Sequence, residues 1–127
     1  MKKFTLIIEK SGDSYLGRVL YDEDLIVDEA ETLSELEILI KQTLYRFYQL
    51  KPEAILFNYK YDLSALFEKF SYLKISNVAR MAGVNASLLR QYVTGEKQAS
   101  AKQAKKIEIA IHEIAKELLA VKVHGKA

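Results

Sequence analysis

The hydrophobic pattern of this chain changes its period near Asp62, and this change limits the folds that the chain can adopt. Before that residue, apolar and polar side chains alternate in residues 15–21 and 54–61, which is typical of strands with one buried face. After it, apolar side chains recur every three or four positions, which is typical of amphipathic helices. The sequence therefore predicts two parts with different secondary structure.

The first part is predicted to hold four strands and one long helix. The strands are expected at residues 3–9, 15–21, 25–27 and 54–61. Thr32 and Glu35 form a capping box, and helical spacing then continues over residues 33–50 until Pro52. We therefore predict an α+β fold, with a small βββαβ N-terminal unit (residues 1–62) followed by an all-α helix-turn-helix domain (residues 63–127).

Composition excludes several classes of function. The 127 residues include no cysteine and two histidines, so disulfides, thiolate zinc sites, cysteine nucleophiles and three-histidine metal sites are excluded. The apolar stretch at residues 4–8 is shorter than the roughly 7–15 apolar residues of a secretory signal. No apolar run reaches the ~18 residues of a membrane span. We expect a cytoplasmic protein without a membrane partner, a cofactor or a bound metal.

Charge is divided unequally between the two parts. Residues 1–62 hold eight Lys/Arg and twelve Asp/Glu, a net charge of −4, whereas residues 63–127 hold eleven and five, a net charge of +6. Residues 22–37 contain eight acids and no base, and residues 74–106 contain seven bases and one acid. This asymmetry indicates different partners for the two parts. A solvated face could carry the same acidic run, and that alternative stays open.

Residues 75–94 have the spacing of a helix-turn-helix. Ala79 is small where two crossing helices approach, and Gly83 suits the positive φ of a tight turn. Asn85 can cap the second helix. The side chains expected in the small core beneath the turn are Val78, Ala82, Val84, Leu89 and Tyr92. This pattern resembles that of phage-repressor and Xre-type DNA-binding domains, with a purely structural helical hairpin as the alternative.

In such a domain the second helix enters the major groove of DNA. Arg90 can bond guanine bidentately and Gln91 can bond adenine, each of which reads a base edge. The other expected DNA contacts are polar or basic side chains: Asn85, Ser87 and Thr94 beside the recognition helix, and Lys74, Lys97 and Lys102 on the phosphate backbone. The predicted nucleic-acid partner is double-stranded operator DNA.

A long helix with an apolar seam is predicted after Ser100, which forms a capping box with Gln103. Members of the seam are spaced alternately three and four residues apart: Ala104, Ile107, Ile111, Ile114, Leu118 and Val121. The seam either packs within its own domain or forms the interface of a homodimer or homotetramer. A dimer would let the helix-turn-helix bind two half-sites.

The order of the predicted elements resembles that of HicB-type antitoxins. The matching N-terminal pieces are residues 7–10 in the first strand, 14–15 in the second and 32–35 at the helix start. The C-terminal half is similar to HicB-family DNA-binding proteins from the Bacteroides group. The segments that carry this similarity are residues 61–66, 84–85, 89–92, Gly95 and 103–108.

This resemblance implies a partly degenerate ribonuclease-H-like unit that sequesters a small basic ribonuclease toxin of the HicA type. It also implies a helix-turn-helix that represses the shared operon, so that the chain would be a DNA-binding antitoxin and transcriptional autorepressor. The acidic run suits a basic partner, and the expected partner-binding residues are Asp22, Asp24, Asp28, Glu29 and Glu31.

Two other classes of function compete with this one. The Asp-Leu-Pro-Gly-Cys segment common in the family is missing, and residues 25–31 stand in its place. The alternative is therefore a stand-alone transcriptional regulator whose N-terminal unit serves oligomerisation or ligand sensing.

An enzyme of the ribonuclease-H type would need convergent carboxylates around Mg²⁺. The candidates are Glu9, Asp13, Asp22, Asp24 and Asp28. Asp13, Asp22 and Asp24 fall in predicted turns, where solvated acids are expected, so we predict no catalytic residue and no enzyme.

Overall fold

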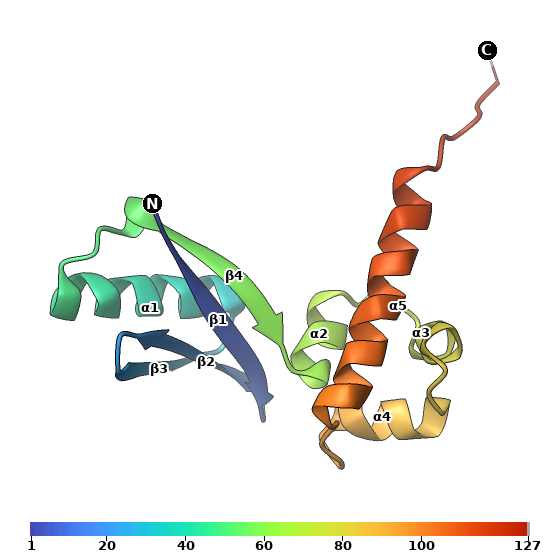
Figure 1. Cartoon of the computed structure of the whole chain (residues 1–127), viewed down its shortest axis with the longest axis horizontal. Helices are drawn as coiled ribbons and strands as arrows, with labels where there is room; N and C mark the ends of the chain where they lie inside the picture. Colours follow the sequence, from blue (N-terminus) through green and yellow to red (C-terminus); the bar gives the residue numbers. More distant parts are fainter. Residues whose placement is uncertain (127) are drawn as a thin grey trace. The chain divides into compact units, whose positions relative to one another are not determined.

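A computed structural model describes residues 1–126 of the chain and divides it into two compact units, Met1–Lys69 and Phe70–Ala127 (Figure 1). The first unit consists of β1 (Lys2–Ser11), β2 (Ser14–Tyr21), β3 (Asp24–Ala30), α1 (Leu33–Tyr48), the 3₁₀ turn η1 (Pro52–Ala54), β4 (Ile55–Tyr61) and α2 (Leu63–Lys69). The second unit consists of α3 (Ile75–Ala82), α4 (Ala86–Thr94) and α5 (Ala101–Leu119). None of the helices in the described part of the chain is long and apolar enough to span a membrane.

The predicted fold class, a βββαβ unit followed by an all-α domain, is wrong. The structure is an α+β fold in which a four-stranded mixed sheet and five α-helices are interleaved, with α1 between β3 and β4. Helices are not confined to a separate C-terminal domain, because α2 packs against β1 and β4 and belongs to the first unit. The boundary between the units therefore follows Lys69 and not Asp62.

Hydrogen bonds from β1 and β2 explain why α2 packs against the sheet in the first unit. The Asp62 carboxylate caps α2 by accepting the Ala65 N–H at 2.8 Å, and it also accepts the Lys10 N–H of β1 at 3.3 Å. On α2, Glu68 accepts the Tyr15 hydroxyl at 2.6 Å and the Lys10 ammonium at 3.1 Å. Burial and the bond to Glu68 raise the pKa of Tyr15 to about 12, and the same bond lowers the pKa of Glu68.

The sheet has the strand order β3-β2-β1-β4. β2 pairs antiparallel with both β1 and β3, whereas β4 pairs parallel with β1. A parallel pair needs a crossover connection, which α1 supplies. The third strand is longer than the predicted residues 25–27, so Asp24, Asp28 and Glu29 are strand residues. β3 and β4 form the two edges of the sheet.

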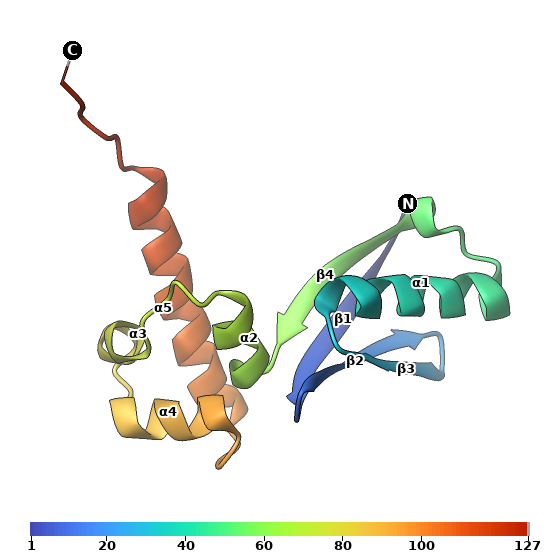
Figure 2. The same ribbon diagram turned by 180° about the vertical axis from the view of Figure 1, so that it is seen from behind.

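α1 lies along one face of the sheet, as Figures 1 and 2 show from opposite sides. The Thr32 hydroxyl caps this helix by accepting the Glu35 N–H at 3.1 Å, as predicted. Leu36, Ile40 and Leu44 of the helix are fully buried. They pack against the buried side chains of the strands, which include Leu6, Ile8, Tyr15, Val19, Ile26, Ile55 and Phe57.

Gly17 on β2 lies directly beneath two side chains of α1. A Cβ built on Gly17 would lie 2.8 Å from Ile40 Cδ1 and 2.9 Å from Leu36 Cδ2. The side chains of Leu36 and Ile40 are fully buried, so neither has free space into which it could move. A residue larger than glycine at this position therefore has to displace these two side chains or separate the helix from the sheet.

We predict that Gly17→Ala lowers the free energy of unfolding by about 1–3 kcal/mol, the usual cost of overpacking a tight core. Urea denaturation followed by far-ultraviolet circular dichroism measures this loss. Gly125→Ala is the matched control, because a Cβ there meets nothing within 4 Å. Equal stability of the two variants would contradict the close packing of α1 on Gly17.

Candidate nucleic-acid interface

The second unit contains a turn with the backbone geometry that the Ala79 and Gly83 spacing predicts. Val78 and Ala79 on α3 are each 1% exposed. Gly83 ends α3 with φ at +70°, and the Val84 N–H bonds the Ala79 carbonyl oxygen at 2.9 Å. This is the hydrogen-bond pattern of a glycine-terminated helix, in which a positive φ turns the chain sharply away. The prediction of a positive φ at Gly83 is confirmed.

α4 begins and ends at residues that fix its position. Asn85 is its N-cap, and its side-chain oxygen accepts the Leu88 N–H at 3.1 Å, which confirms the predicted cap. Gly95 ends α4 with φ at +85°. Leu89 is fully buried, and Val84 is buried beside the turn, whereas the predicted core residue Tyr92 is only partly buried. α4 is therefore held by one inward face, and its opposite face carries the polar residues.

The candidate base-reading residues lie on this outer face. Ser87, Arg90 and Thr94 are exposed, and Gln91 is partly buried. Their spacing of three or four residues places them along one side of the helix. The Thr94 hydroxyl lies 3.2 Å from the Gln91 carbonyl oxygen and 3.3 Å from a Glu96 carboxylate oxygen. The Thr94 hydroxyl can donate to either of these acceptors within the chain.

Basic side chains surround the helix-turn-helix. Lys74 precedes α3, Lys97 follows α4 and Lys102 lies in the first turn of α5, and all three are exposed. Arg80 on α3 is also exposed and is a further basic residue beside those predicted to contact DNA. Arg80 follows the inward-facing residues Val78 and Ala79 on the predicted helix, just before the turn. The sequence therefore already indicated that its side chain faces solvent. Residues 70–127 hold ten Lys/Arg and four Asp/Glu, a net charge of +6.

The apolar seam of α5 is buried near the start of the helix and exposed near its end. Ser100 caps the helix by accepting the Gln103 N–H at 3.2 Å, as predicted. The return bond of the predicted capping box is not made, because the buried Gln103 Oε1 accepts no hydrogen bond from residues 1–126. Ile107 is fully buried within the unit, whereas Leu118 is 63% exposed. Val121 lies beyond the helix, which ends at Leu119, so its prediction as a helical seam member is wrong. The β-branched and glycine residues that follow have low helix propensity.

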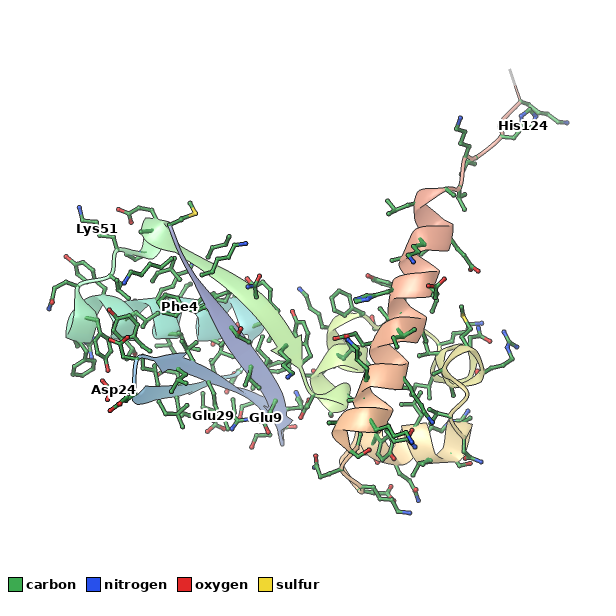
Figure 3. All side chains as sticks on the ribbon, in the orientation of Figure 1. Phe4, Glu9, Asp24, Glu29, Lys51 and His124 are labelled. Carbon is green, nitrogen blue, oxygen red and sulfur yellow. The ribbon has the colours of Figure 1, made fainter. Side chains whose placement is uncertain are left out.

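The candidate partner-binding acids lie along the edge strand β3 and its flanking turns. Asp24 accepts the Tyr48 hydroxyl at 2.6 Å, and Asp28 accepts the Thr43 hydroxyl at 3.1 Å, both from α1. Glu29 accepts the Ser14 hydroxyl. Figure 3 shows Asp24 and Glu29 at opposite ends of β3. Asp22 and Glu31 are exposed in the turns before and after the strand.

These bonds have an electrostatic consequence at the edge. The bond to Asp24 is the largest contribution that raises the pKa of the Tyr48 hydroxyl. No group of three or more His, Cys, Asp or Glu side chains in residues 1–126 is placed to hold a metal ion. Three acids of this edge, Asp24, Asp28 and Glu29, accept hydroxyl groups of the same unit.

Comparison with protein-family models, with curated proteins and with solved structures finds no match for this chain.

Asn85→Ala is expected to lower the free energy of unfolding by about 1 kcal/mol, because the first turn of α4 loses its side-chain cap. Asn85→Asp should retain the cap and most of the stability, since Asp is an equally good N-cap. Urea denaturation of the full chain measures both. Ser87→Ala is the control on the exposed face and should change stability by less than about 0.5 kcal/mol. A loss in Ser87→Ala as large as that in Asn85→Ala would contradict the assigned cap.

Proposed function

We propose that this protein is a DNA-binding antitoxin and transcriptional autorepressor of the HicB type. The observation that carries the proposal is the helix-turn-helix with a positive φ at Gly83 and an outward polar face on α4, within a unit of net charge +6. A hairpin that served structure alone would not need exposed Arg90 and Ser87 on the same face as Gln91.

DNA binding in this proposal combines base contacts with phosphate contacts. α4 enters the major groove, where Arg90 and Gln91 bond base edges, each contributing about 1–3 kcal/mol of discrimination. Lys74, Lys97 and Lys102 neutralise phosphates, so affinity falls as salt rises. The exposed Asn85 and Ser87 at the N-terminus of α4 are suited to a phosphate, because helix N-termini attract anions.

A second copy of the chain is proposed to bind through the C-terminal half of α5. Ile111 and Ile114 are partly buried, and Leu118, on the same seam, is 63% exposed. An apolar stripe on an otherwise charged helix gains free energy by packing against its equivalent. A homodimer of this kind would present two recognition helices to two half-sites.

The acidic edge of the first unit is proposed to bind a small basic protein, a HicA-like ribonuclease toxin. Residues 1–69 hold nine Lys/Arg and thirteen Asp/Glu, a net charge of −4, and the acids gather along β3. Opposite fields steer two proteins together and fix their register. The alternative is a stand-alone regulator whose first unit oligomerises or senses a ligand.

The DNA-binding proposal is tested by mobility shift of a fragment from the protein's own promoter at two salt concentrations. Wild type should retain the fragment specifically, and Arg90→Ala/Gln91→Ala should lose about 2–6 kcal/mol of sequence-specific binding, the sum of two base contacts. Weak binding by the double variant should remain at low salt, because the lysines still neutralise phosphates.

The matched control is Gln42→Ala/Arg46→Ala, which removes the same two residue types from an exposed face of α1. This variant should bind the fragment as wild type does. No retention by wild type at either salt, or equal loss in both double variants, would contradict the proposal. If wild type does not retain the fragment, the acidic first unit becomes the part of the chain in which to seek a protein partner.

The partner proposal is tested with the product of a small basic open reading frame beside the gene. Asp22→Lys/Glu31→Lys reverses two exposed charges at the ends of β3 and should weaken binding at least tenfold, with a smaller loss at high salt because exposed charges are screened. Isothermal titration calorimetry measures the affinity. Glu53→Lys/Glu117→Lys makes the same charge change outside the acidic run and should bind more tightly than the first variant. A locus without such a reading frame, or equal affinity of the two variants, supports the stand-alone regulator.

A further inference from the structure

The two edges of the sheet differ in how they are protected from other strands. An edge strand presents unpaired backbone N–H and C=O groups, and proteins usually guard such an edge with charged side chains. β3 is guarded in this way, because Asp24, Asp28 and Glu29 are three of its seven residues. β4, Ile-Leu-Phe-Asn-Tyr-Lys-Tyr, is also seven residues long and carries Lys60 as its single charge.

The β4 edge is accessible within the first unit. α1 packs mainly over β2 and β3. Two of its side chains reach β4, because Glu37 accepts the Tyr59 hydroxyl and the Lys41 ammonium lies 5.7 Å from the centre of the Phe57 ring. Leu56 is 44% exposed, Tyr59 is 49% exposed, and Asn58 and Lys60 are also exposed. The strand itself is ordered by a ladder of aromatic rings, with Phe57 and Tyr59 centroids 6.3 Å apart and Tyr59 and Tyr61 centroids 6.2 Å apart.

We propose that β4 pairs antiparallel with β4 of a second copy of this chain, which joins the two sheets into one of eight strands. Full overlap of the seven residues places the two-fold axis at Asn58, so that Asn58 faces its own equivalent. On the α1 side of the sheet, Ile55 then faces Tyr61 of the second copy and Phe57 faces Tyr59 of the second copy. Aromatic pairs with β-branched or aromatic side chains are among the stabilising cross-strand pairs.

Charge favours pairing of β4 with itself over pairing of β3 with itself. In the β4 pair Lys60 faces Leu56 of the second copy, so no like charges are opposed. Two β3 strands paired about Val27 would place Asp28 opposite Ile26 and diagonally beside Asp28 of the second copy. They would also gather six acids at the junction, against two lysines in the β4 pair, and like charges across strands are destabilising. A second copy fits β4 because the strand is complementary to itself in length, side-chain type and charge. This interface is separate from the α5 seam and from DNA binding.

The test introduces charge on the proposed two-fold axis of the full-length protein. Asn58→Glu and Asn58→Lys each place two like charges opposite one another, so each variant alone should have half the assembly mass of wild type. An equimolar mixture of the two variants should regain the wild-type mass, because opposite charges then meet at the axis. Size-exclusion chromatography with multi-angle light scattering measures these masses over a range of protein concentrations.

The matched control is Val27→Glu, which places the same charge at the centre of β3, the guarded edge, and should leave the mass unchanged. The halving is expected whether or not α5 also forms an interface, since the two surfaces are independent. A variant that only failed to fold would not recover in the mixture. Unchanged mass in the Asn58 variants, failure of the mixture to regain mass, or an equal loss in Val27→Glu would overturn the proposal.

Discussion

The close approach of α1 to Gly17 determines which surfaces of the first unit remain open. Because no Cβ intervenes at this position, the buried Leu36 and Ile40 settle directly on β2. α1 then covers one face of the sheet, and α2 packs against β1 and β4. Leu20 and Leu25, paired across β2 and β3, are exposed on the opposite face. The surfaces proposed to bind partners are β3 and β4, the two edge strands of this sheet.

Local hydrogen-bonding chemistry made the helix ends predictable from sequence. Thr32, Asn85 and Ser100 each cap a helix as expected, because a short polar side chain reaches N–H groups only two or three residues away. Gly83 adopts a positive φ for a similarly local reason, since the turn is defined by its own backbone. The positions of the candidate DNA-contacting residues followed from the same short-range rules.

The parts that could not be predicted depend on contacts distant in sequence. α2 belongs to the sheet because Lys10 and Tyr15 bond Asp62 and Glu68, which are more than fifty residues away. No local pattern reveals such pairs. For the same reason, the acidic run did not reveal that Asp24 and Asp28 are bonded by hydroxyls of α1. The charge of a run is visible in a sequence, whereas the internal hydrogen bonds of its members are not.

The opposite charges of the two units give a physical reason why a basic partner and DNA could influence each other. The net charge of the chain is +2 because an acidic unit of −4 offsets a basic unit of +6. DNA phosphates attract the second unit and repel the first, and this repulsion extends about a Debye length, ~8–10 Å at physiological salt. A basic protein bound along β3 would neutralise the acidic charge of the first unit, and the recognition helix belongs to the second unit. In the proposed function, partner binding would therefore strengthen DNA binding through the field alone, and this coupling would weaken as salt rises.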